Sequence, residues 1–148
     1  SDDPHALGGS LLLSQFGGSD QFPGLPADPA GLVRALTRVA ALDSTLATHD
    51  VSDGGLAVTL AELVTADAGV DATVDSGAAL FAETAGRVVV ETTAPDAVRE
   101  AVSDDATVTA LGTATDSGSL DLSVGADRLT YDTEELAALR SVLESALD

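Results

Sequence analysis

The chain has 148 residues and carries 25 acidic side chains against six basic ones, all of them arginine, so its formal net charge is −19. Such a surface repels nucleic acid and anionic membranes, because binding to phosphates requires Lys or Arg. The chain has no cysteine, which excludes disulfides, thiol nucleophiles and Cys-ligated zinc, and it has no apolar run long enough to span a bilayer.

The charge also indicates where the chain is expected to work. Self-repulsion at a net charge of −19 destabilises a compact state in dilute buffer. At about 1 M salt the Debye length falls to about 3 Å, and the repulsion is screened. We therefore expect a cytoplasmic protein of a halophile, in which most carboxylates serve solvation and not chemistry.

Dialysis from molar to millimolar KCl is expected to unfold the domain, because unscreened carboxylates then repel one another. Circular dichroism measured across that range reports the loss of secondary structure. A spectrum that stays unchanged would contradict the halophilic interpretation.

Residues 1–31 are predicted to form a loop-rich N-terminal segment, partly mobile when isolated, that lies against a neighbouring domain. The triplet GGS occurs at Gly8–Ser10 and at Gly17–Ser19, on either side of the apolar run LLLSQF, and three prolines follow. The chain contains no Met, and its first residues lack the basic and apolar regions of a secretory signal. We therefore expect a piece of a longer chain, in which residues 32–148 form a single α/β domain.

A helix is predicted to begin after Asp28, because Asp is a favoured N-cap and Pro29 suits the first helical position. Apolar side chains at helical spacing extend this helix to about Leu46. A short extended stretch at His49–Val51 follows.

Helices and strands then alternate. Three consecutive valines in Gly86–Thr92 predict a central strand that is covered on both faces. Further strands are expected at 70–74, 106–114 and 119–124, and further helices at 56–65, at 77–82 after a Ser76 cap, and at 95–102. This order indicates an α/β (α+β) domain with a mixed sheet covered by helices.

The last helix is predicted from a capping-box pattern, in which Asp132 precedes Glu135 by three positions. One face of this helix then carries leucines at positions 136, 139, 143 and 147. An amphipathic helix is therefore expected to end the domain.

The stretch THDVSDGGL, residues 48–56, is predicted to pass from a strand to a helix. Ser52 or Asp53 supplies an acceptor for the first N–H groups of the helix, and Gly54 and Gly55 permit positive φ. The N-terminus of such a helix attracts anions. No lysine follows the glycines, so the stretch is not a P-loop, and a phosphate would need Mg²⁺ or backbone N–H groups.

Two interpretations of this stretch stay open. One is a structural junction between a strand and a helix, in which His49 is a hydrogen-bonded structural residue. The other is an anion site for a phosphate group, which the negative charges of Asp50 and Asp53 oppose unless Mg²⁺ lies between carboxylate and phosphate.

Arg87 also has two interpretations. Its guanidinium suits a clamp on a phosphate or a carboxylate, because it binds such groups through two parallel hydrogen bonds. The alternative, which the many carboxylates of the chain favour, is an ion pair with Glu83 that fixes the turn before the valine strand.

Four stretches of the sequence resemble a known family. HDVSDGGLAVTLAE at His49–Glu62 is similar to part of the last domain of phosphoribosylformylglycinamidine synthases. LGGS at Leu7–Ser10, LFAETAGRVVVE at Leu80–Glu91 and ALGTAT at Ala110–Thr115 resemble that domain in the same order and spacing. The chain is thereby identified as a C-terminal domain of the aminoimidazole ribonucleotide synthetase-like superfamily.

The resemblance implies part of an ATP-dependent ligase of purine biosynthesis. In this family ATP and Mg²⁺ activate formylglycinamide ribonucleotide, and ammonia from glutamine then yields formylglycinamidine ribonucleotide. The implied partners are the preceding domains of the same chain, a glutaminase subunit and a small bridging subunit, in the cytoplasm. The catalytic residues and the metal ligands are expected in the preceding domains, so this chain holds none of them and is inactive alone.

The resemblance also bears on the turn at residues 48–56. The family is internally duplicated and carries an auxiliary nucleotide site. The residues that would line such a site here are His49, Asp50, Ser52, Asp53, Gly54 and Gly55.

Two other functions stay open. One is the aminoimidazole ribonucleotide synthetase or another enzyme of the superfamily. The other, from a different class, is a non-catalytic acidic interaction domain.

Overall fold

The computed structural model describes residues 3–147, and the side chains up to residue 141. The chain forms two compact units, each made of two segments. They are unit 1 (Ser1–Thr59 and Phe81–Ala110) and unit 2 (Leu60–Leu80 and Leu111–Asp148). The division into an N-terminal segment and one α/β domain from residue 32 stays a prediction.

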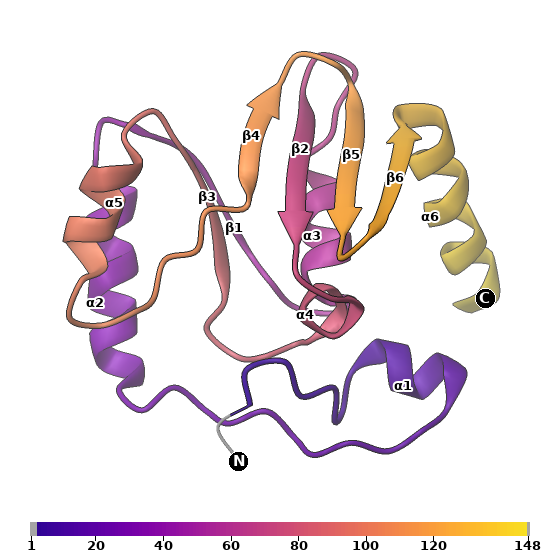
Figure 1. Cartoon of the computed structure of the whole chain (residues 1–148), viewed down its shortest axis with the longest axis horizontal. Coiled ribbons are helices and arrows are strands. Elements are labelled where there is room, and N and C mark those ends of the chain that lie inside the picture. Colours follow the sequence, from indigo (N-terminus) through magenta and orange to yellow (C-terminus); the bar gives the residue numbers. More distant parts are fainter. Residues whose placement is uncertain (1–2, 148) are drawn as a thin grey trace. The chain divides into compact units, whose positions relative to one another are not determined.

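Unit 1 combines helices with a two-stranded antiparallel sheet (Figure 1). Its elements are α1 (Leu11–Phe16), α2 (Pro29–Ala40), β1 (Thr45–Asp50), β3 (Val88–Thr92) and α5 (Pro95–Val102), and α3 (Gly55–Glu62) begins in it. His49 of β1 faces Val89 of β3 in this ladder. The side chains of β1 alternate between half-buried and exposed, as expected for a sheet with one covered face.

The core of unit 1 lies between α2 and α5. Ala35 and Val39 of α2 pack with Val98 and Val102 of α5, and all four side chains are at most 5 % exposed. Leu42, Val90 and Ala101 pack against this cluster. Burial of apolar area contributes about 25 cal/mol per Å², so this contact holds the two helices together.

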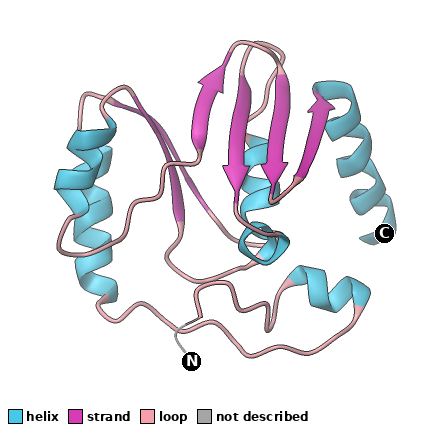
Figure 2. Cartoon of the chain, in the orientation of Figure 1, coloured by secondary structure: helices cyan, strands magenta, loops and turns pink. Residues whose placement is uncertain are grey.

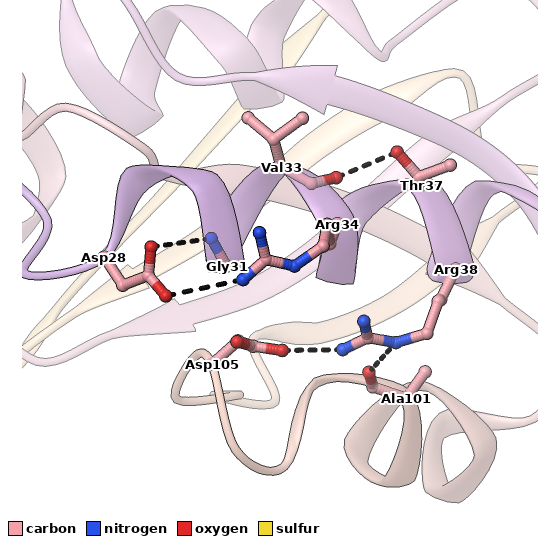
Figure 3. A network of polar contacts seen from close by, with 8 residues as sticks. All are labelled: Asp28, Gly31, Val33, Arg34, Thr37, Arg38, Ala101 and Asp105. Carbon is pink, nitrogen blue, oxygen red and sulfur yellow. Dashed lines mark hydrogen bonds and ion pairs between the residues drawn. The ribbon is translucent and has the colours of Figure 1, made fainter.

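Polar contacts flank that core (Figure 3). Asp28 caps α2, since its Oδ1 accepts a hydrogen bond from Gly31 N at 2.9 Å. Arg38 joins α2 to α5, because its Nη2 lies 2.6 Å from Asp105 Oδ2 and its Nε donates to Ala101 O at 2.9 Å. The predicted cap at Asp28 is therefore confirmed.

Unit 2 contains a four-stranded mixed sheet (Figure 2). Its elements are β2 (Gly69–Val74), β4 (Gly112–Thr115), β5 (Ser119–Val124), β6 (Asp127–Asp132) and α6 (Thr133–Leu147), and α4 (Gly77–Phe81) begins in it. The strand order is β4-β2-β5-β6, with β2 parallel to β5 and the other pairs antiparallel. The predicted fold class, α/β with a mixed sheet, is confirmed.

Several element boundaries differ from the predictions. The helix that begins at Pro29 ends at Ala40 and not near Leu46, because the backbone from Thr45 onward pairs with β3. The strand expected from residue 106 begins at Gly112, where pairing with β2 begins. The helix expected to reach residue 65 ends at 62, and α1 and β6 were not predicted.

The predicted central position of the valine strand is wrong. Within the described residues, β3 pairs with β1 alone in the two-stranded sheet, and its three valines are half-buried. A run of apolar residues does not by itself distinguish a strand covered on both faces from one in a small sheet. The position of β3 depends on pairing with β1, which is distant in sequence.

The start of α6 confirms the capping box. Asp132 N donates to Glu135 Oε2 at 2.9 Å, and Glu135 N donates to Asp132 Oδ1 at 2.8 Å. On the predicted apolar face Leu136 is buried, whereas Leu139 is 54 % exposed. The side chains of the leucines at 143 and 147 lie outside those described.

Candidate functional site

The turn after β1 is tied to the rest of unit 1 through its backbone. Val51 is buried, and its N–H donates to Arg87 O at 3.0 Å, which extends the β1–β3 ladder by one bond. Asp50 O accepts a hydrogen bond from Thr59 Oγ1 of α3 at 3.1 Å. The strand, the turn and the following helix are thus fixed together.

The Gly-Gly pair adopts the conformation that the sequence predicts. Gly54 and Gly55 have φ of +82° and +65°, a region that residues with a Cβ seldom adopt. A Cβ on Gly54 would also lie 2.2 Å from Val58 Cγ2. Gly55 N donates to Ser52 O at 2.9 Å and closes the turn. The positive φ and the overlap with Val58 together explain why position 54 is a glycine.

The acceptor at the start of α3 is Glu83. Its Oε1 accepts a hydrogen bond from Gly54 N at 2.8 Å, a role that the sequence assigned to Ser52 or Asp53. The same oxygen accepts a second bond from Leu11 N of α1, also at 2.8 Å. Bonds to a charged carboxylate are roughly twice as strong as neutral ones. Glu83 therefore joins three stretches of unit 1 that are far apart in sequence.

The predicted site residues around this turn are only partly brought together. The side chains of Asp50, Ser52 and Asp53 are exposed. His49 is half-buried, with its Nδ1 2.7 Å from Asp50 O. Gly54 N donates to Glu83 Oε1 and Gly55 N donates to Ser52 O, so both glycine N–H groups have a partner within unit 1.

The arginines of the chain already bind its own oxygens. Each of the six arginines contacts at least one carboxylate oxygen or backbone carbonyl oxygen. The contacts are Arg34–Asp28, Arg38–Asp105, Arg99–Asp96, Arg128–Asp121, Arg87–Ala82 O and Arg140–Ala61 O. Among the described residues, no group of three or more His, Asp or Glu is arranged to hold a metal ion.

Arg87 is half-buried, and burial lowers the pKa of its guanidinium from the usual value. One of its contacts is Nη1 donating to Ala82 O at 2.9 Å. Its own carbonyl accepts from Val51 N. The ion pair with Glu83 and the anion clamp both stay predictions.

The two GGS triplets meet in space, which the sequence did not indicate. The first triplet, together with Gly18 and Ser19 of the second, lines a shallow pocket beside α1. Gly8 N donates to Gln21 O at 2.9 Å, and a Cβ on Gly8 would lie 2.4 Å from that oxygen. Asp20 accepts from Leu7 N and Gln21 N, and these bonds hold the pKa of its carboxyl below the usual range.

The fourth stretch that resembles the family, ALGTAT at Ala110–Thr115, contains the whole of β4. Leu111 O accepts from Thr73 N at 2.8 Å, and Gly112 faces Ala72 of β2. A Cβ on Gly112 would lie 1.9 Å from Asp71 O. This glycine lets two backbones approach closely.

The fold and the site together define a class: a mixed α/β domain whose characteristic glycines and glutamate hold backbone segments together. A model of the family described as AIR synthase related protein, C-terminal domain, matches residues 3–125. The chain belongs to this family. No helix in the described part of the chain has the length and hydropathy to cross a membrane.

The chain is also similar to proteins named phosphoribosylformylglycinamidine synthase subunit PurL. The relative from Natronomonas pharaonis is 56 % identical over 146 residues, which cover 96 % of this chain and 20 % of the relative. The relative from Haloarcula marismortui is 50 % identical, with 98 % and 21 % covered. A relative from Lactobacillus acidophilus is 30 % identical, with 85 % and 17 % covered. The chain thus spans about a fifth of the length of these relatives.

Proposed function

We propose that the chain is the C-terminal domain of the synthetase subunit of a phosphoribosylformylglycinamidine synthase from a halophile. The reaction of the whole enzyme would be the ATP-dependent conversion of formylglycinamide ribonucleotide and glutamine-derived ammonia to formylglycinamidine ribonucleotide. The observation that carries the proposal is the 50–56 % identity to haloarchaeal relatives over nearly the whole chain.

Within such an enzyme we assign the domain a scaffold role. In all four matched stretches, a glycine or a glutamate makes a close backbone approach or a backbone hydrogen bond: Gly8, Gly54, Glu83 and Gly112. These residues shape the domain through backbone contacts, and we expect the reactive side chains in the preceding domains. ATP and Mg²⁺ would bind mainly in the preceding domains. The further partners would be a glutaminase subunit and a small bridging subunit, in the cytoplasm.

Replacing the corresponding fifth of the Natronomonas pharaonis relative with this chain tests the proposal. In molar KCl with ATP, Mg²⁺, ammonia and formylglycinamide ribonucleotide, the chimera should form formylglycinamidine ribonucleotide, as the unaltered relative does. The relative truncated before this domain, and this chain alone, should not. A folded chimera that is inactive would contradict the proposal.

The same exchange separates the two alternatives. An aminoimidazole ribonucleotide synthetase that becomes active with this domain, while the PurL chimera stays inactive, would favour that enzyme. A stand-alone acidic interaction domain predicts that neither chimera is active. The similarity over nearly the whole chain to PurL relatives supports the leading proposal over both.

The auxiliary nucleotide site at residues 49–55 is a separate hypothesis, and its support is the resemblance to a family that carries such a site, together with the attraction of a helix N-terminus for anions. Against it, Gly54 N already donates to the Glu83 carboxylate, and Asp50 and Asp53 add negative charge. We therefore expect no saturable binding of ADP to the isolated chain in molar KCl with Mg²⁺, measured by calorimetry. Binding that is lost in Asp53→Ala would instead establish a nucleotide site at this turn.

A further inference from the structure

Asp53 and Gly54 form the single Asp–Gly pair of the chain, which contains no asparagine. An aspartate followed by glycine is prone to isomerise, because the backbone nitrogen of a residue without a Cβ readily approaches the aspartate side chain. The side chain of Asp53 is exposed, so water reaches it. The turn therefore contains a backbone bond that can modify itself without an enzyme.

The isomerisation has two steps, and both use only water. In the first, Gly54 N attacks Cγ of the protonated Asp53 carboxyl and forms a cyclic imide, while the Gly54 proton and the carboxyl hydroxyl leave as water. In the second, water adds to the main-chain carbonyl carbon of Asp53 and breaks its bond to Gly54 N. The product is an isoaspartate, whose main chain runs through Cβ and Cγ and is longer by one methylene group.

The structure holds the attacking nitrogen away from this reaction. Gly54 is buried, and its N–H donates to Glu83 Oε1 at 2.8 Å. Gly55 N donates to Ser52 O at 2.9 Å, so the backbone on both sides of the pair is fixed. The peptide plane between Asp53 and Gly54 cannot rotate toward the side chain without breaking the bond to Glu83, and bonds to a charged acceptor are roughly twice as strong as neutral ones.

The charge of Glu83 acts in the same direction as its hydrogen bond. Attack requires Gly54 N to lose its proton, which leaves negative charge on the nitrogen, and a neighbouring like charge disfavours that form. The Glu83 carboxylate is itself kept in place, because the same oxygen accepts a second bond from Leu11 N at 2.8 Å. The carboxylate therefore opposes both the rotation and the deprotonation that the first step needs.

We propose that Glu83 protects the Asp53–Gly54 bond from isomerisation, in addition to binding the turn. The positive φ of Gly54 and its contact with Val58 favour glycine at this position, so the fold requires the residue that makes the pair labile. An isoaspartate at position 53 would lengthen the backbone and displace Gly54 N from Glu83. The protection comes from a residue 29 positions away and does not depend on the proposed function.

Prolonged incubation of the folded chain in molar KCl measures the reaction. Isoaspartate at position 53 is quantified by mass spectrometry with electron-transfer fragmentation, which distinguishes it from aspartate. A synthetic peptide with the sequence of residues 49–58 gives the unrestrained rate under the same conditions. The folded chain should isomerise about tenfold or more slowly than the peptide, because the turn must open before the nitrogen can attack.

Two variants identify Glu83 as the cause. Glu83→Ala should isomerise at least about tenfold faster than the parent, because it removes a charge-assisted hydrogen bond from the reacting nitrogen. Glu83→Gln keeps an acceptor oxygen without the charge, so its rate should lie between the two. Protection of α2 amides from hydrogen exchange shows that each variant is folded. The bond Asp116–Ser117, in an exposed turn of unit 2, is the internal control and should isomerise at one rate in all three proteins.

Three results would overturn the proposal. Equal rates at position 53 in the folded chain and in the peptide would show that the fold does not restrain the bond. Equal rates in the parent and in both folded Glu83 variants would show that the carboxylate is not the restraint. A slower reaction in Glu83→Ala would give the carboxylate the opposite role, that of a base which removes the Gly54 proton.

Discussion

Glu83→Ala should lower the free energy of unfolding by about 2 kcal/mol, because it removes the acceptor of two backbone N–H groups, one of them on the buried residue Gly54. Leu11 is partly exposed, so water replaces the acceptor there more readily. Urea denaturation in molar KCl measures the change. Amide hydrogen exchange at Gly54 should accelerate more than exchange at core amides of α2.

Two further variants separate the causes of this effect. Glu83→Gln keeps an acceptor oxygen and removes the charge, so it should lose roughly 1 kcal/mol or less. Glu100→Ala makes the same charge change at an exposed position of α5, and its effect should stay within about 0.5 kcal/mol. If Glu83→Ala proved as stable as Glu100→Ala, with unchanged exchange at Gly54, the carboxylate would not hold the turn.

Gly112→Ala should destabilise the chain by about 3 kcal/mol, because the added Cβ overlaps backbone that cannot easily move aside. The Cβ would lie 1.9 Å from Asp71 O and 2.9 Å from Ala72 Cα, both in β2. Strand β4 must then move away from β2 and weaken the pairing between Gly69–Ala72 and Gly112–Thr115. The urea midpoint, and hydrogen exchange at amides of β4, measure the loss.

Gly77→Ala is the matched control in unit 2. Nothing lies within 4 Å of a Cβ built at Gly77, which is the first residue of α4. The variant should be as stable as the parent, or more stable by up to about 1 kcal/mol, because alanine favours the helix. Equal stability of the Gly112 and Gly77 variants would show that β4 tolerates a side chain at its start.

The glycine and glutamate positions show that each of the four stretches that resemble the family contributes a backbone contact to the fold. Gly112 allows β4 to approach β2, Gly54 turns the chain into α3, and Glu83 binds that turn to α1. Under the proposed function, a scaffold of this kind would support a site whose reactive groups lie in the preceding domains. Chemistry in the proposed enzyme would then depend on how this domain is docked.

Features that depend on near neighbours in the chain were determined by the sequence itself. The cap at Asp28, the capping box of Asp132 and Glu135, and the helix at Pro95–Val102 all agree with the structure. Each rests on contacts between residues three or four positions apart, so the pattern of residue types suffices to predict it. The glycine turn at residues 54–55 belongs with them, because positive φ is a local property of glycine.

Features that depend on distant partners were decided by the tertiary structure. The carboxylate of Glu83 binds N–H groups 29 and 72 positions away, and no local pattern in the sequence predicts these contacts. The valines of β3 predicted a central strand, and pairing with β1 placed it in a two-stranded sheet. Composition and spacing do not specify which backbone donors a side chain meets after folding, because loop closure brings together groups that have no local relation.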